Sequence, residues 1–125
     1  MTVSYAQALK DTRMNAVLSA VDGPSGFASI EIGTAGMAQV LVIINLSKPS
    51  FSEASSTLTM LGAPKNGVAS TAGTAANARV KDGSGGVQVS GLTVGISGTD
   101  IVLNSTSILQ GQTVTLTSAT ITHSP

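Results

Sequence analysis

The sequence predicts a mainly β fold, a β-sandwich or jelly-roll-like barrel with one N-terminal α-helix. Three observations lead to this fold class. The best helix candidate lies at the start of the chain, before a firm stop near residue 22. Beyond Gly26 the chain becomes a series of short runs rich in β-branched residues, serine and threonine, which is typical of strands. Clusters of glycine, proline and asparagine separate these runs, which favours a sandwich or barrel over a parallel α/β sheet.

The predicted helix covers residues 4–21. This segment lacks glycine and proline and is rich in residues with high helix propensity. Its apolar residues recur at helical spacing, in one strip of Val3, Ala6, Met14, Val17 and Val21 and a second strip of Leu9, Ala16 and Ala20. Ser4 is the predicted N-cap, and Asp22-Gly23-Pro24 ends the helix. Such a wide apolar face indicates packing on the core or docking on a neighbouring subunit.

Residues 27–122 are predicted to form about seven or eight short strands. Residues 27–32 alternate between two faces, with Ala28, Ile30 and Ile32 on the apolar one, as in a half-buried strand. Residues 39–46 are almost continuously apolar, which predicts a central strand covered on both faces. Residues 62–67 predict a turn. The other segments from which these strands are expected to form are residues 56–61, 68–71, 75–81, 87–89, 92–96, 100–103 and 112–122.

Three local patterns refine this picture. Residues 82–86, Asp-Gly-Ser-Gly-Gly, predict a hairpin turn. In residues 112–122 the apolar alternation shifts by one residue near Thr117-Ser118, which predicts a bulge or bend. Residues 69–76 carry little side-chain bulk, which predicts an extended loop or an edge that orders only on assembly.

The composition describes a surface with little charge. The chain has 125 residues, and 42% of them are hydrophobic while only 10% are charged; an average soluble domain has about 25% charged residues. The formal net charge is zero, so little repulsion keeps copies apart. The length suits a single domain over residues 1–125. These properties favour a protein that packs against other subunits.

Two partner classes are disfavoured by the same composition. The six basic residues form no stripe along the chain: they are Lys10, Arg13, Lys48, Lys65, Arg79 and Lys81. With only three aromatic residues to stack bases, we expect no nucleic-acid binding. The most apolar run, residues 40–46, is far too short to span a bilayer, and residues 1–8 show no signal-peptide pattern. We therefore expect no membrane partner.

The side chains that carry catalysis are few. The chain has no cysteine and one histidine, His123, whose place near the end predicts a solvated tail residue. The six acidic residues are widely spaced and form no calcium loop; they are Asp11, Asp22, Glu31, Glu53, Asp82 and Asp100. On helix or strand faces we expect solvated charges. We therefore expect no enzyme, no catalytic, cofactor-binding or metal-binding residues, and no cofactor.

The three aromatic residues are Tyr5, Phe27 and Phe51. The simplest interpretation is that they anchor the core. The alternative is that Phe51, in a loop after Pro49, inserts into a pocket on a neighbouring subunit.

Three stretches carry a resemblance to a known class of proteins: residues 5–14, 30–38 and 98–114. Together they resemble small structural proteins of tailed-bacteriophage virions, of the capsid decoration or accessory head type. The resemblance implies a protein of the virion, assembled in the host cytoplasm, that sits between capsomers and cements the head. Its implied partners are the major capsid protein or other virion proteins and, as a trimer, itself. It implies no catalytic residues.

Two other functions stay open. One is a tail-tube, neck or connector component of the virion. The other is a surface carbohydrate-binding module, although sugar sites usually use aromatic platforms and this chain has few aromatics. For the cement function we expect subunit contacts at the N-terminal arm and one loop, that is at Thr2, Val3, Ser4, Tyr5 and Phe51.

Overall fold

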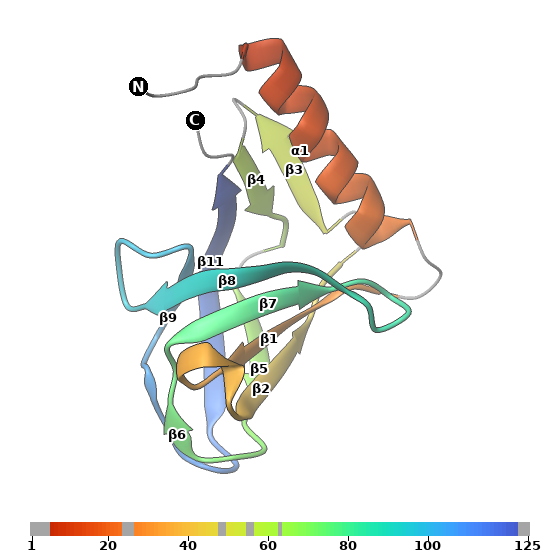
Figure 1. The fold of residues 1–125 in the computed structure, drawn as a ribbon. Coiled ribbons are helices and arrows are strands. Elements are labelled where there is room, and N and C mark those ends of the chain that lie inside the picture. The colour runs from red at the N-terminus through yellow and green to blue at the C-terminus, as the bar shows by residue number, and fades with distance from the viewer. Residues whose placement is uncertain (1–5, 24–26, 48–49, 55–56, 63, 123–125) are drawn as a thin grey trace.

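A curled β-sheet dominates the computed structural model of the chain, which describes residues 6–23, 27–47, 50–54, 57–62 and 64–122. Within these residues the protein is mainly β, with one N-terminal helix and a mixed sheet that forms a half-barrel (Figure 1). The predicted fold class is therefore confirmed. The described residues hold eleven strands, which is more than the predicted number. Several of these strands are too short to show a pattern in the sequence and form only because they pair with distant strands.

The helix α1 spans Gln7–Asp22, and a short 3-10 helix, η1, spans Ala35–Met37. The strands are β1 Ser29–Gly33, β2 Val40–Asn45, β3 Phe51–Ala54, β4 Thr57–Met60, β5 Lys65–Val68, β6 Gly73–Thr74, β7 Asn77–Lys81, β8 Val87–Gly95, β9 Ile101–Leu103, β10 Ser107–Ile108 and β11 Thr113–Thr122.

The large sheet runs in the order β2-β1-β7-β8-β9-β11-β4-β3, and β5 also pairs with β11. The described pairs are antiparallel except β8 with β9. The long strand β11 joins two regions. Its first half pairs with β5 and β9 in the half-barrel, and its last residues pair with β4. Figure 1 shows β11 running from the half-barrel up to the β3–β4 hairpin beside α1.

The half-barrel curls until β5 approaches β2. The backbone N–H of Ser70 donates to the carbonyl oxygen of Leu41 at 2.9 Å. A Cβ added to Gly67 would lie 2.9 Å from Ile44 Cγ1 and 3.0 Å from the carbonyl oxygen of Ile43. Only a glycine lets the two strands come this close.

Two strand predictions are wrong in this region. Residues 62–67 were expected to form a turn only, but Lys65–Val68 is β5 and pairs with Thr113–Leu116. Residues 39–46 were expected to be central, yet β2 ends the sheet order, and Ile43 is 51% exposed. The apolar run in β2 has another cause. Leu41, Val42 and Ile44 are buried, because β5 approaches β2 along the edge that no paired strand covers.

The last strand follows its predicted pattern. Val114, Leu116, Ala119 and Ile121 are all buried. The register with β9 shifts between Leu116 and Ser118, and the Thr117 hydroxyl donates to the carbonyl oxygen of Val102 at 3.0 Å. The predicted bulge is confirmed. It lets one strand keep its apolar face inward while it leaves the half-barrel and joins the β3–β4 hairpin.

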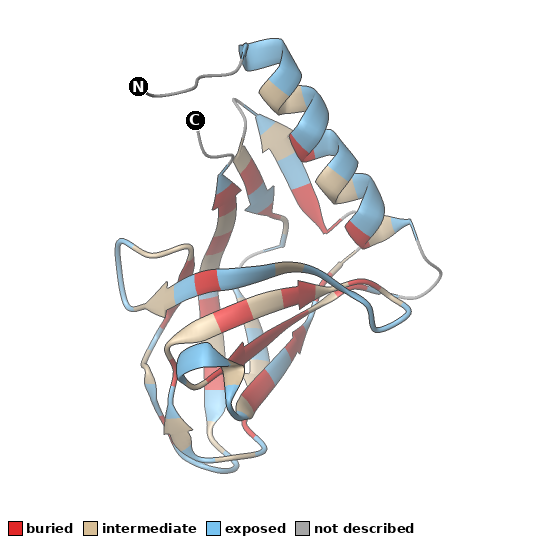
Figure 2. Ribbon diagram, in the orientation of Figure 1, coloured by how far each residue is buried: buried red, intermediate tan, exposed pale blue. Residues whose placement is uncertain are grey.

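The helix packs one narrow face on β3 and β4 (Figure 2). Met14 and Val21 are buried, and Val17 and Leu18 pack partly against the core. The second predicted strip is exposed, because α1 lies at the end of the sheet and has sheet on one side only. Ser4 lies outside the described residues; Ala6 occupies the N-cap position and makes no side-chain cap bond.

The turn after β7 is the predicted hairpin turn, and its first residue organises it. The Asp82 carboxylate accepts bonds from the backbone of Gly86, from the hydroxyl and backbone of Ser84 and from the Gln88 amide. The Gly86 bond, followed by those from Ser84 and Gln88, lowers the pKa of Asp82 to about 2. Asp82 thus bonds the backbone of its own turn, as an aspartate in a turn is expected to do, and it is buried there.

Of the two expectations for residues 69–76, an extended loop or an edge that orders only on assembly, the structure fits the extended loop, with the two-residue strand β6 inside it. Strand β6 pairs with β10, and Ala69 and Ala75 are buried. The small side chains are required here because a Cβ on Gly73 would lie 3.0 Å from Leu41 Cδ2.

Candidate binding pocket and exposed apolar side chains

The structure corrects one of the predicted interface residues. Phe51 does not lie in a loop; it is the first residue of β3, opposite Met60 of β4, and only 1% of it is exposed. It therefore belongs to the hydrophobic core, as the simpler interpretation held, and it is not presented to a neighbour. The other predicted interface residues, Thr2, Val3, Ser4 and Tyr5, lie outside the described residues, as does His123.

The six acidic residues accept hydrogen bonds that hold the fold. Two examples are Asp100, whose Oδ2 accepts from the backbone and hydroxyl of Thr93, and Asp22, whose Oδ2 accepts from the Ser50 backbone. The other four are Asp11, Glu31, Glu53 and Asp82. No group of three or more histidine, cysteine, aspartate or glutamate side chains within the described chain could hold a metal ion.

Glu31 is the acidic residue that departs most from expectation. It was expected to be solvated, but only 6% of it is exposed, because Arg79 and Lys81 of the neighbouring strand cover it. Arg79 Nε lies 2.6 Å from Oε1, and Lys81 Nζ lies 3.1 Å from Oε2. Burial raises the pKa of Glu31, but the hydrogen bonds and positive charges of the two cations outweigh it and lower the pKa overall.

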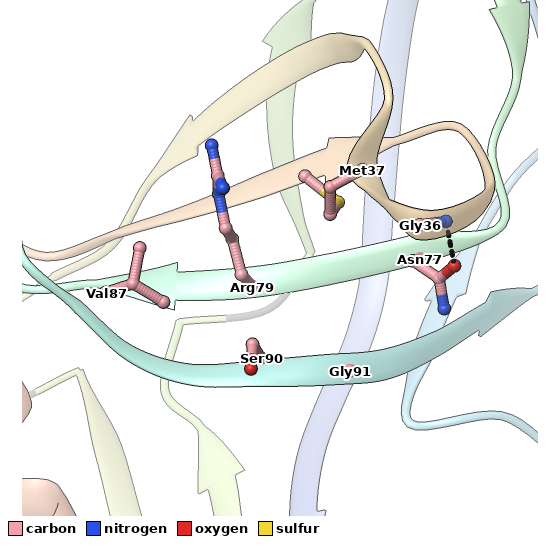
Figure 3. A pocket seen from close by; sticks show the side chains of 7 residues that line it. All are labelled: Gly36, Met37, Asn77, Arg79, Val87, Ser90 and Gly91. Atoms are coloured by element: carbon pink, nitrogen blue, oxygen red, sulfur yellow. Dashed lines mark hydrogen bonds between the residues drawn. The ribbon is translucent and has the colours of Figure 1, made fainter.

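Arg79 also lines a cavity of about 370 Å³ on the outer side of the sheet. The cavity lies between η1 and the strands β7 and β8 (Figure 3). Its lining residues are Gly36, Met37, Asn77, Arg79, Val87, Ser90 and Gly91. Figure 3 shows the Arg79 side chain rising from β7 between Val87 and Met37. The cavity therefore combines one cation, polar groups and two apolar side chains.

An irregular turn forms one wall of this pocket. Gly36 and Met37 have φ values of 67° and 59°, and Met37 is the non-glycine residue with positive φ in the described chain. Glycine adopts such a conformation freely, but at Met37 it costs about 1–3 kcal/mol. Asn77 ties the turn to the sheet, because its Oδ1 accepts from the Gly36 N–H at 2.8 Å while its Nδ2 donates to the carbonyl oxygen of Leu92.

A bulge forms the opposite wall. Ala78 pairs with Leu92 and Val80 pairs with Val89, so β8 has one extra residue between these pairs. Gly91, with a φ of 75°, lies in this extra segment beside Ser90. Bulges re-aim side chains and interrupt strand edges. This one contributes residues to the pocket and also breaks the free edge of β8.

Among the described residues, seven large apolar side chains are 43–67% exposed. They are Leu9, Phe27, Ile43, Val68, Val87, Ile96 and Leu109. They come from the helix, from strand edges, from the β7–β8 hairpin and from loops. They thus belong to several elements of the fold rather than to one.

Sequence reasoning missed the pocket, because its residues are far apart in the chain. The available signal was the isolated Gly91 inside a strand run, which favours a bulge. Comparison of the chain with models of protein families, with curated proteins and with solved structures gives no match. Within the described residues, no helix has the length and apolar character needed to cross a membrane.

Proposed function

We propose that this chain is a structural protein of a bacteriophage virion, a decoration or cement protein that binds between capsomers and stabilises the head. The observation that carries this proposal is that exposed apolar side chains occur on the helix, on strands and in loops of a chain with few charges. A subunit that contacts several neighbours at once needs such a surface, whereas a dimer would concentrate its apolar residues in one patch.

The mechanism is stabilisation by mass action. Burying one valine, leucine or isoleucine side chain contributes about 1.5–3 kcal/mol, so each contact with a neighbour is modest. Many copies that bind the assembled shell and not its free subunits raise the free energy needed to open the shell. The partners in this proposal are the major capsid protein and further copies of the chain in a trimer, and its location is the virion.

We also propose that the chain is not an enzyme and uses no cofactor. The support is that its acidic side chains are engaged in hydrogen bonds that build the fold. A carbohydrate-binding function receives less support, because the residues that line the pocket include no aromatic side chain.

Labelled electron microscopy of purified particles tests the location. A tagged chain should decorate the whole head; label confined to the tail or neck would overturn the head proposal in favour of the tail component. The N-terminal arm is tested by deletion of residues 1–5, with copies per particle as the readout.

Single substitutions test the apolar contacts. Ile43→Ser should lower the number of copies per head, because Ile43 is half exposed on β2. Asn45→Ser is the matched control, since Asn45 is an exposed polar residue of the same strand. If Ile43→Ser, Val68→Ser and Ile96→Ser all leave occupancy at the control value, the apolar contacts do not hold the protein on the head.

A further inference from the structure

We propose that the pocket between η1 and the β7–β8 strands binds a carboxylate group through the guanidinium of Arg79. The proposal does not depend on the virion function. It rests on the hydrogen bonds that Arg79 makes and leaves unmade, on the local balance of charge and on the walls of the cavity.

The guanidinium of Arg79 is fixed in place and only partly used. Its Nε donates to Glu31 Oε1 at 2.6 Å, which sets the plane of the group. Its two terminal amino groups make no hydrogen bond within the part of the chain that the structure describes. Two parallel N–H groups in a fixed plane match the two oxygens of a carboxylate. The arginine is therefore preorganised to bind a planar anion.

The local charges favour an anion. Glu31 contributes one negative charge, and Arg79 and Lys81 contribute two positive charges, which leaves a net charge of +1 around the ion pair. Among the described residues, no acidic side chain lines the cavity. Asp82 follows Lys81 in the chain and carries a further negative charge, but its carboxylate faces its own turn and Gln88 and forms no ion pair with Arg79 or Lys81 within the described residues. A bound carboxylate would offset the positive charge that Glu31 leaves on Arg79 and Lys81.

The walls define the rest of the ligand. Ser90 lines the same cavity as Arg79, and its hydroxyl has no partner in the described chain. Met37 and Val87 flank Arg79 with apolar surface (Figure 3). A carboxylate on a short aliphatic stem fits this pocket, because the carboxylate can bind Arg79 and the stem can pack on Met37 and Val87. The glutamate side chain of another protein has this chemistry, and so does a free short-chain carboxylic acid.

An NMR titration of the ¹⁵N-labelled full chain tests the proposal. The probes are butyrate, its neutral analogue butyramide, and N-acetylglutamate N′-methylamide, which presents the glutamate side chain on a peptide backbone. Butyrate at about 50 mM should fill most of a site with a Kd of about 10 mM. The shifts should saturate and centre on the amides of Gly36, Ser90 and Gly91, and butyramide should cause none.

Substitutions connect the shifts to the arginine. Arg79→Lys keeps the charge but loses the planar pair of donors, so the Kd for butyrate should rise at least fivefold. Arg13→Lys, the same change on α1, is the matched control and should leave the Kd unchanged. Ser90→Ala, which does not disturb the Glu31 ion pair, should raise the Kd about twofold to fivefold and so keeps the test valid if Arg79→Lys fails to fold.

The outcomes separate the two sources of the carboxylate. If the glutamate probe binds at least tenfold more tightly than butyrate, the ligand is a protein side chain; equal affinities indicate a free acid. Absence of saturable shifts, equal shifts with butyramide, or a Kd unaffected by both Arg79→Lys and Ser90→Ala would overturn the proposal. None of these results alters the expected decoration of the head, which is measured on particles.

Discussion

Replacement of Phe51 by alanine separates its two interpretations, core anchor and interface anchor. A buried phenylalanine side chain withdraws about 150–250 Å² from water, and about 25 cal/mol per Å² gives about 4 kcal/mol at the lower limit. Measured changes of core phenylalanine to alanine cost about 3–5 kcal/mol. Because Phe51 is almost completely buried, we expect Phe51→Ala to lower the free energy of unfolding by about 4 kcal/mol.

Urea unfolding of the purified chain measures this change. With an m-value of about 2 kcal/mol/M, the midpoint should fall by about 2 M. Phe27→Ala is the matched control: Phe27 is 65% exposed, so the same substitution should cost less than about 1 kcal/mol. Phe51→Leu keeps more of the volume and should cost about 1–2 kcal/mol, so a folded variant remains available.

An equally small effect of Phe51→Ala and Phe27→Ala on the urea midpoint would contradict the core position of Phe51. That result would mean that Phe51 is solvated in the isolated chain, and it would favour the interpretation that Phe51 inserts into a pocket on a neighbouring subunit. A loss of stability that grows on dilution would also point to burial between subunits rather than within one.

The remaining predictions concern the hairpin turn, the closure of the half-barrel and the buried ion pair. The pKa of the Asp82 carboxyl is about 2 in the folded chain, below its ordinary value of 3.8. The ionised carboxylate therefore stabilises the fold fully above about pH 4, and this stabilisation is lost as the pH falls through 2. Asp82→Asn should remove this part of the pH dependence of the urea midpoint, measured from pH 5 to pH 2. Gly67→Ala should cost about 1–3 kcal/mol in thermal or urea unfolding, because its Cβ would press on β2; an unchanged midpoint would refute the close approach. Glu31→Gln leaves Arg79 and Lys81 without their shared anion and should cost about 1–3 kcal/mol near pH 7. The same substitution at Glu53, whose hydrogen bond from Asn15 is exposed, is the control and should cost less than about 1 kcal/mol.

The parts of the fold that sequence predicted are those set by neighbouring residues. The bulge near Thr117 was visible because the apolar alternation of one strand changes phase, and no other strand is needed to see it. The turn at residues 82–86 was visible because its glycines and its aspartate form a turn locally. The helix was found with a shift of its first residue from 4 to 7, since its start has no side-chain cap to mark it.

The parts that sequence missed depend on distant partners. Lys65–Val68 has turn-forming residues and becomes β5 only because β11 pairs with it. Glu31 looked like a surface charge, and its burial arises because Arg79 and Lys81, almost fifty residues away, lie on the next strand. The pocket combines an irregular turn, a strand arginine and a bulge, so no single stretch of the chain contains it.

The most direct test of the central claim uses heads that lack this chain. Particles from a phage with the gene deleted are mixed with the purified full chain, and two quantities are measured: bound copies per head and the temperature at which the heads release their DNA. The cement function predicts saturable binding at a fixed ratio to the major capsid protein and a rise of the release temperature by several degrees. No binding to the depleted heads, or binding with an unchanged release temperature, would contradict it.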